Sequence, residues 1–446
     1  MDLQRAAELL GVPCADAECR FEGVCTDSRK VEPGMLFAAL PGERVDGHDF
    51  ISRAVEAGAV AVLASREVSA GVPVLVVDDV LRALGQLAAG WRAECAPAVV
   101  GITGSNGKTT VKEMVASVLR RRGQVLATQG NYNNELGVPL TLFGLAPEHD
   151  FAVLEMGAAK AGDIAYLAGI AQPRVGVITN VGPAHLEGFG DQAGVARAKG
   201  EMYQALPADG TAVINADQPW AAGWQERCSA GRVIRFALSA DAQVRGAMLE
   251  HKARIETPDG RFEVALVLPG EHNLSNALAA TAVALALDVP LDDIRAGLED
   301  VRPVPGRLNL LAADGGWQVI DDTYNANPAS LYAALQVLTR QPGEAWLALG
   351  DMKELGPDAR KLHAEMGDAA RALGVRRLYA TGEMSKHTVD AFGGGARHFE
   401  DREALVTALK DALRPGVTCL VKGSRSMGME HVVRAIVNGD GLREAV

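Results

Sequence analysis

The stretch that decides the fold spans residues 98–110 and reads Ala98-Val99-Val100-Gly101-Ile102-Thr103-Gly104-Ser105-Asn106-Gly107-Lys108-Thr109-Thr110. Its first six residues suit a buried strand, and residues from about 109 to 121 have the pattern of a helix. Glycines between a strand and a helix let backbone N–H groups surround phosphate oxygens, and the helix N-terminus adds positive potential. The stretch therefore predicts a phosphate-binding loop over residues 104–110.

The residues of this loop also predict roles for individual side chains. Lys108 can reach the β- and γ-phosphates of a nucleotide, and the Thr109 hydroxyl can ligate Mg²⁺. The longer G-x-x-x-x-G-K-[ST] pattern is not met because position 102 is isoleucine, whereas the shorter pattern Gly104-x-x-Gly107-Lys108-Thr109 is met. The alternative is a glycine-rich turn that is only structural.

Strands and helices alternate on the C-terminal side of the loop. Residues 152–156, 175–179 and 212–215 read as strands, residues 233–267 as a β-rich antiparallel stretch, and residues 276–287 as an apolar helix. The alternation indicates an α/β fold with a doubly wound parallel sheet.

Two segments mark expected domain boundaries. Residues 94–97 resemble a linker, and the proline-rich residues 301–307 precede a second β/α alternation with strands at 318–321, 345–349, 377–380 and 418–421. We expect three domains. They are a small mixed α/β N-terminal domain (1–96), a central domain with a P-loop-type parallel sheet (97–312) and a Rossmann-like C-terminal domain (313–446).

Composition restricts the classes of partner. The chain has 446 residues, a net charge of −12 and a pI of about 5.3, so it repels phosphate backbones and a nucleic-acid partner is not expected. No segment reaches the roughly 18 consecutive apolar residues needed to span a bilayer, and the first residues lack the pattern of a signal peptide. We expect a cytoplasmic monomer without membrane insertion, whose six cysteines are free thiols.

Polar side chains follow several strands of the expected central sheet. Glu155 and His185 would lie at the same sheet edge as the loop, where ligands of open α/β sheets bind, and either can ligate a metal. A solvated strand-end carboxylate and a structural histidine are the alternatives. Lys199 begins a helical stretch, and composition alone favours a solvated lysine.

Further polar groups follow in the second half of the chain. Asn273 and Asn276 are three residues apart and can share a helix face, where amides suit an adenine edge, although Asn273 can equally cap the helix. Asp321 and Asp322 end a strand and can serve ribose hydroxyls, a cation or a helix cap. The loop at 350–356 follows the next strand, so we expect a site that faces the middle domain.

Together these residues resemble the Mur ligase family over nearly the whole chain. Residues 26–29 (Thr26-Asp27-Ser28-Arg29), 36–40 and 46–50 resemble the domain that holds the UDP-sugar, and residues 103–110 resemble the ATP loop. The resemblance implies that Asp27, Ser28 and Arg29 contact the UDP-sugar.

The resemblance also implies roles near the ATP loop. Thr109, Glu155, His185 and a carbamylated Lys199 would ligate Mg²⁺, and Lys108, His185 and Lys199 would be catalytic. Asn273, Asn276, Arg307 and Asp322 match positions that hold adenine and ribose.

Three stretches resemble the branch of the family that adds D-alanyl-D-alanine: residues 130–139, 322–328 and 349–356. They imply substrate contacts from Asn133, Asn134, Tyr324, Asn325 and Asp351. The implied reaction transfers the γ-phosphoryl group of ATP to the terminal carboxylate of a UDP-N-acetylmuramoyl-tripeptide. The amine of D-alanyl-D-alanine then attacks the acyl phosphate.

Two other functions remain possible from the sequence. A folylpolyglutamate synthetase is an amide ligase of the same superfamily, but a pterin substrate leaves residues 26–50 without a role. A nucleotide-switched binding protein fits the loop but leaves His185, Lys199 and the last domain unexplained.

Overall fold

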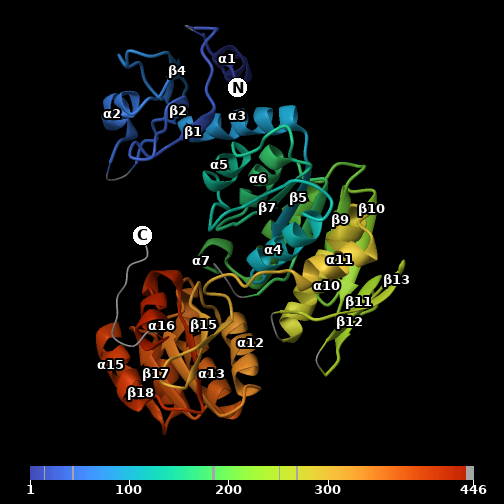
Figure 1. Ribbon diagram of the computed structural model, residues 1–446, viewed down its shortest axis with the longest axis vertical. Helices are drawn as coiled ribbons and strands as arrows, with labels where there is room; N and C mark the ends of the chain where they lie inside the picture. The colour runs from blue at the N-terminus through green and yellow to red at the C-terminus, as the bar shows by residue number, and fades with distance from the viewer. Residues whose placement is uncertain (15, 43–44, 183–185, 251, 268–269, 438–446) are drawn as a thin grey trace.

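The computed structural model describes residues 1–14, 16–42, 45–182, 186–250, 252–267 and 270–437. Three sheets follow one another along the long axis of the molecule, in chain order, with the largest sheet between the other two (Figure 1). The expected mixture of α and β structure in three units is therefore present.

The first sheet is parallel, with the order β1-β2-β3-β4 (Gly23–Cys25, Met35–Ala38, Ala61–Ala64 and Val74–Val76). It packs with α1 (Leu3–Leu10), α2 (Ile51–Glu56) and α3 (Val80–Cys95). The expected linker at 94–97 is partly wrong, because α3 continues to Cys95. The helix ends where Ala96 takes a left-handed conformation (φ 49°) before Pro97, since a residue that precedes proline is disfavoured in a helix.

The central sheet has the strand order β13-β12-β11-β10-β9-β8-β5-β7-β6. Strands β5 to β11 pair in parallel, and β11, β12 and β13 pair antiparallel. The antiparallel pattern expected over 233–267 therefore begins only after β11, because β10 still pairs in parallel with both of its neighbours. The bounds are β5 Ala98–Thr103, β6 Val125–Ala127, β7 Phe151–Glu155, β8 Val175–Ile178, β9 Thr211–Asn215, β10 Arg232–Ala237, β11 Val244–Met248, β12 Ala253–Thr257 and β13 Gly260–Val264.

Helices cover both faces of the central sheet, as its buried strands require. One apolar core joins α4 (Lys108–Leu119), α10 (Glu271–Ala286) and α11 (Leu291–Glu299) to the sheet. The other core lies under α5 (Gly137–Leu142), α6 (Asp163–Ala171), α8 (Gln192–Gln204) and α9 (Ala221–Glu226), and α3 reaches it from the first domain. The short helix α7 (Leu186–Phe189) precedes α8.

The third sheet has the order β14-β15-β19-β16-β17-β18, with only β14 antiparallel. Because β14 (Asn309–Ala312) pairs with β15 (Gln318–Asp322), this sheet begins before the expected boundary at residue 313. The remaining elements are α12 (Pro328–Thr339), β16 (Glu344–Gly350), α13 (Ala359–Ala372), β17 (Arg377–Thr381), α14 (Ser385–Phe392), β18 (Ala396–Phe399), α15 (Arg402–Ala412), β19 (Val417–Lys422) and α16 (Glu430–Val437).

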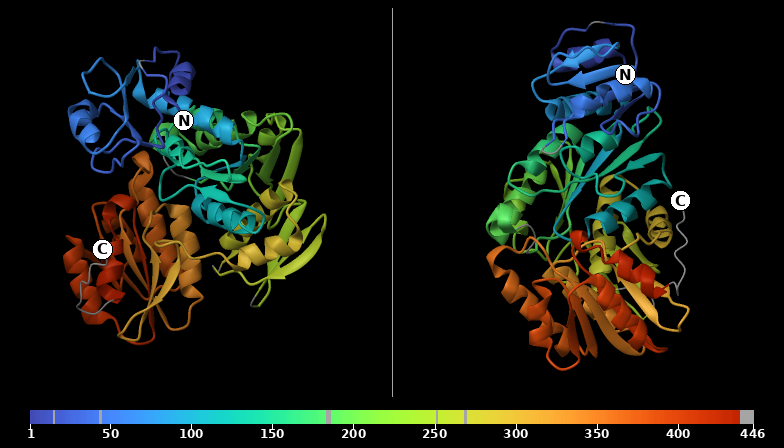
Figure 2. Two further views of the ribbon diagram at one scale, coloured as in Figure 1. Left: turned by 45° about the horizontal axis from the view of Figure 1, so that its top comes forward. Right: turned by 90° about the vertical axis from the view of Figure 1, so that its left-hand side faces the viewer.

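The third domain lies beside the central one (Figure 2). Residues at the ends of β15, β16 and β19 line the same cavity as the loop after β5. Ligands of open parallel sheets bind beyond the carboxyl ends of the strands. No helix in the described part of the chain is long and apolar enough to cross a membrane.

Candidate nucleotide-binding site

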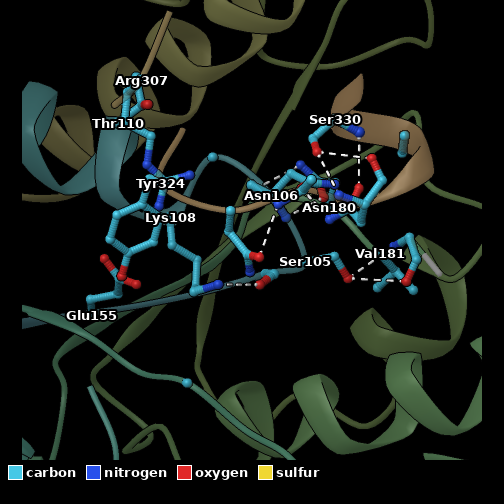
Figure 3. A pocket seen from close by; sticks show the side chains of 18 of the residues that line it. Ser105, Asn106, Lys108, Thr110, Glu155, Asn180, Val181, Arg307, Tyr324 and Ser330 are labelled. Atoms are coloured by element: carbon cyan, nitrogen blue, oxygen red, sulfur yellow. Dashed lines mark hydrogen bonds between the residues drawn. The ribbon is translucent and has the colours of Figure 1, made fainter. Parts of the chain in front are cut away.

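A cavity of about 1090 Å³ lies between the central and C-terminal domains. Figure 3 shows Lys108, Glu155, Arg307 and Tyr324 on one side of it, with Asn180 and Ser330 on the other. It brings together most of the side chains expected from the sequence. Those that line it are Gly104, Ser105, Asn106, Gly107, Lys108, Thr110, Asn133, Asn134, Glu155, Lys199, Asn273, Asn276, Arg307, Asp322, Tyr324 and Asn325.

The loop after β5 has the backbone that its glycines predict. Gly107 has φ 81° and is the N-cap of α4, a left-handed conformation that favours glycine. A β-carbon on Gly107 would also clash with the Asn276 side chain, so the first turn of α4 lies directly against α10. The loop is therefore open to a phosphate on one side and supported by α10 on the other.

Lys108 lies at the start of α4 and lines the cavity. Its Nζ donates a hydrogen bond to the Gly104 carbonyl at 3.0 Å, across the loop. Burial and the nearby Arg307 lower the pKa of Lys108, while Glu155 raises it. The side chain is a cation held beside backbone N–H donors, and this combination suits a phosphate.

Glu155 is buried at the end of β7 and is not the solvated strand-end charge that was its alternative. Its two oxygens accept hydrogen bonds at 2.8 Å, one from the Thr109 hydroxyl and one from the Asn133 amide. Arg307 donates to Thr109 at 3.2 Å from the other side. Thr109 itself lies behind the cavity surface, so a carboxylate and a hydroxyl meet beside the loop.

Lys199 is also buried, which overturns the solvated lysine favoured by composition. It lies in α8 and lines the cavity. Burial, with a smaller contribution from Lys108, lowers the pKa of Lys199 to about 7. Its side-chain amine is therefore partly neutral at physiological pH.

The loop after β8 supports the phosphate-binding loop. Asn180 accepts a hydrogen bond from the Asn106 backbone N–H at 3.0 Å, and the Gly182 N–H donates to the Ser105 hydroxyl at 3.0 Å. His185, expected to be a metal ligand in this loop, lies outside the described residues.

Asn273 and Asn276 share a helix face, as their spacing predicts. Asn276 donates to Asn273 at 3.1 Å on one face of α10. The helix begins after Gly270, so Asn273 lies within the first turn and is not the cap. Asn273 also contacts the His272 ring at 3.1 Å, and burial lowers the pKa of His272 to about 4, which leaves that imidazole neutral.

Further polar groups of the cavity come from Arg307, which precedes the third sheet, and from the loop after β15. Arg307 stacks over the Tyr324 ring at 4.0 Å, and its buried Nε has no hydrogen-bond partner among the described residues. Asn327 caps α12 and donates a hydrogen bond of 2.8 Å to the Asn106 side chain in the phosphate-binding loop. The two domains are therefore directly connected at the loop.

Asp351 does not line the cavity as expected. Its side chain is fully buried and accepts from Lys353, from the Ser385 hydroxyl and from backbone N–H groups at the start of α14. It therefore anchors the loop whose neighbouring residues Lys353 and Glu354 do line the cavity. A sequence motif does not distinguish a side chain that faces a ligand from one that holds the loop.

The side chains expected to contact the UDP-sugar are Asp27, Ser28 and Arg29. They lie in the first domain, apart from this cavity. Arg29 donates two hydrogen bonds to Asp27, at 2.9 and 2.8 Å, and these bonds hold the pKa of Asp27 well below its usual range. Ser28 is buried beside them.

Lys422 was not expected from the sequence. It ends β19, lines the cavity and forms a buried ion pair with Asp322. A lysine at the carboxyl end of an apolar parallel strand is the signal that could have revealed it. Asn180 and Asn327 were also missed, because capping and loop contacts between distant segments leave no spacing pattern.

A phosphate-binding loop that faces a second parallel sheet across one cavity is the architecture of a nucleotide-dependent enzyme. Three family models match the chain. They are the Mur ligase family catalytic domain (20–92), the Mur ligase middle domain (102–284) and the Mur ligase glutamate ligase domain (306–425). The chain belongs to the Mur ligase family.

Two of the most similar curated proteins have the same name. The UDP-N-acetylmuramoyl-tripeptide–D-alanyl-D-alanine ligase of Escherichia coli K12 is 43% identical, with 97% of this chain and 98% of that protein covered. The ligase of the same name from Haemophilus influenzae is 40% identical, with 96% of each chain covered. The MurF structure from Acinetobacter baumannii superposes with a TM-score of 0.90 at 35% identity, with 98% of each chain covered.

Two further structures are similar to this chain to different degrees. MurF from Thermotoga maritima, solved in complex with ADP, has a TM-score of 0.85 at 30% identity and covers 94% of this chain and 97% of its own. The Mycobacterium tuberculosis folylpolyglutamate synthase has a TM-score of 0.65 at 20% identity, covering 81% of this chain and 95% of its own. That second likeness shows the fold alone, so the alternative of a folylpolyglutamate synthetase is not favoured.

Proposed function

We propose that this chain joins D-alanyl-D-alanine to a UDP-N-acetylmuramoyl-tripeptide and converts ATP to ADP and phosphate. The observation that carries the proposal is the cavity between the central and C-terminal domains. It holds the phosphate-binding loop beside buried lysines and faces polar loops of a second domain. The choice of substrates is supported by relatives that are named for them, one of which is 43% identical with 97% of this chain covered.

The first step transfers the γ-phosphoryl group of ATP to the terminal carboxylate of the tripeptide. Lys108 and the backbone N–H groups of residues 104–107 neutralise negative charge on the transferring group. Arg307 presents a buried Nε that is free to donate to a phosphate or acyl oxygen. The product of this step is an acyl phosphate and ADP.

The residues beside the loop fit Mg²⁺, which prefers oxygen ligands. Glu155 and Thr109 already meet at 2.8 Å with oxygen atoms beside the loop, and His185 is a further candidate. A carbamate on Lys199 would replace a buried amine with an anion. Bound there, Mg²⁺ supplies positive charge to the phosphate oxygens.

The second step is attack by the dipeptide amine on the acyl carbon, which expels phosphate and leaves an amide. The C-terminal domain would bring the dipeptide, because Lys353, Glu354 and Arg425 face the same cavity as the ATP loop. Tyr324, Asn325, Asn133 and Asn134 line this cavity as well. Holding both reactants in a closed cavity favours attack by the amine over attack by water.

We assign residues 1–96 to the UDP-sugar, through Asp27, Ser28 and Arg29. Residues 97 to about 308 would hold ATP, and the C-terminal domain would clamp its nucleoside end through Asp322 while Asn273 and Asn276 contact adenine. We also propose that the enzyme works as a monomer. ATP and UDP-sugar precursors place the reaction in the cytoplasm.

Phosphate release measured with each substrate omitted in turn tests the proposal. We expect release only when ATP, Mg²⁺, the UDP-sugar tripeptide and D-alanyl-D-alanine are all present, with a stoichiometric amide product. A nucleotide-switched binding protein would release phosphate without the amine. A folylpolyglutamate synthetase would require a pterin, and either outcome refutes the assignment.

A further inference from the structure

The carboxylate of Asp322 is held by two protein groups at the end of β15. Its Oδ2 accepts from the Lys422 ammonium, and its Oδ1 accepts from the Leu308 backbone N–H at 3.3 Å. Asp322 and Lys422 are direct register partners on neighbouring parallel strands, so the contact is fixed by the sheet. The carboxylate plane therefore cannot rotate freely.

Lys422 also fixes the loop that follows Asp322. Its Nζ donates a second hydrogen bond, at 3.0 Å, to the Asn325 carbonyl. This loop carries Tyr324, which stacks on Arg307, and Asn327, which contacts the phosphate-binding loop. One ammonium thus holds both the carboxylate and the backbone beside it.

Burial of either charge without its partner would be unfavourable. The Lys422 side chain is 3% exposed and that of Asp322 is 10% exposed. Burial raises the pKa of Asp322 and lowers the pKa of Lys422, while each charge opposes that effect on the other. Removal of Lys422 leaves the Asp322 carboxylate buried without its partner cation, and this strongly favours protonation of Asp322.

The geometry leaves room for a ligand. An ionised carboxylate has about four lone-pair positions, and the described contacts occupy one on each oxygen. One acceptor position therefore remains on each oxygen, and both residues line the cavity. Two acceptors on one fixed carboxylate match a pair of neighbouring hydroxyls.

We propose that Lys422 is a positioning residue for the nucleotide, which holds Asp322 as an oriented carboxylate that accepts from both ribose hydroxyls. The inference rests on the proposed use of ATP and extends it to a residue that does not itself contact the reacting atoms. A purely structural role for the ion pair would change stability without changing how the protein distinguishes sugars.

Calorimetric binding of ADP and of 2′,3′-dideoxyadenosine diphosphate provides the test. We expect the wild-type protein to prefer ADP by about tenfold or more, because the ADP hydroxyls can donate to a charged acceptor and the dideoxy analogue has none to donate. Lys422→Met should reduce this preference to less than about threefold, and Lys422→Arg should retain part of it.

The controls separate positioning from folding. The double variant Lys422→Met with Asp322→Asn removes both charges, so it keeps the fold without an unpaired ion, and its preference should equal that of Asp322→Asn alone. Lys361→Met, at a side chain 73% exposed on α13, should bind both ligands as the wild type does. Thermal unfolding shows which variants are folded.

Three outcomes contradict the inference. An unchanged preference for ADP in folded Lys422→Met would make the pair only structural, and the proposed function would stand. Equal wild-type affinity for the two ligands would show that Asp322 does not bind ribose. Failure of the wild type to bind ADP at all would instead refute the nucleotide site.

Discussion

Lys199 is the side chain whose burial has the largest consequence for chemistry. Only the neutral amine reacts with CO₂, and burial lowers the pKa of Lys199 to about 7 from an ordinary value of 10.5. At pH 7.5 about three quarters of such an amine is neutral, against about 0.1% for an ordinary lysine. The fold therefore increases the reactive fraction by several hundredfold, and we predict a carbamate at Lys199 when Mg²⁺ is bound.

Removal of CO₂ is the direct perturbation. We expect the ligase activity of wild-type enzyme to fall at least tenfold in CO₂-free buffer at pH 6.5 and to recover on addition of bicarbonate. ¹³C-labelled bicarbonate should give a carbamate resonance in the wild type that is missing in Lys199→Met. Full activity without CO₂, together with no carbamate resonance in the Mg²⁺- and nucleotide-bound enzyme, would refute the reasoning.

Stability provides a second measurement on the same residue. Because the folded pKa is lowered, the folded protein binds fewer protons than the unfolded chain between about pH 7 and 10.5, so stability rises with pH across that window. The unfavourable burial of the ammonium is fully present below pH 7. Without CO₂, Lys199→Met should therefore be more stable than the wild type at pH 6, by up to about 5 kcal/mol in the free energy of unfolding.

Three further predictions concern other parts of the cavity and the first domain. Lys108→Ala should abolish amide formation, while thermal unfolding shows an intact fold; near-normal ligation would remove the phosphate-loop assignment. Ser28→Ala should raise the KM for the UDP-sugar tripeptide and leave the KM for ATP unchanged, and the reverse pattern would contradict the domain assignment. Asn327→Ala should lower stability by about 1 kcal/mol through loss of the α12 cap and should raise the KM for ATP. An unchanged KM would show that the bond to Asn106 does not affect the nucleotide.

The strand–loop–helix pattern around residues 98–110 was sufficient to predict the central sheet, because its spacing is local in sequence. The side chains at strand ends were also brought to one edge, as parallel topology requires. Element ends were predicted less well. Helix α3 continues past the expected start of the linker, and β14 joins the last sheet before residue 313, since pairing with a distant strand is not encoded in the composition of either segment.

The spacing of residues in the sequence did not predict which polar side chains are buried. Lys199 and Glu155 read as ordinary surface charges by composition, yet both are buried, because α8 and β7 pack with those positions turned toward the loop. Asp351 shows the opposite error. It belongs to a polar loop at the expected edge, but three-dimensional packing directs its carboxylate to the start of α14, where it satisfies backbone N–H groups.

The distribution of charge explains how an acidic protein accommodates a polyanionic ligand. The net charge is −12, so long-range attraction does not gather nucleotides at the surface. Lys108, Lys199, Arg307 and Lys422 instead converge on one cavity, where charges are screened less by salt than on the surface. Burial disfavours the charged forms of Lys108, Lys199 and Lys422 in the free protein, and an anionic ligand relieves that cost when it binds. Nucleotide affinity should therefore depend only weakly on ionic strength, in contrast to binding by exposed basic patches.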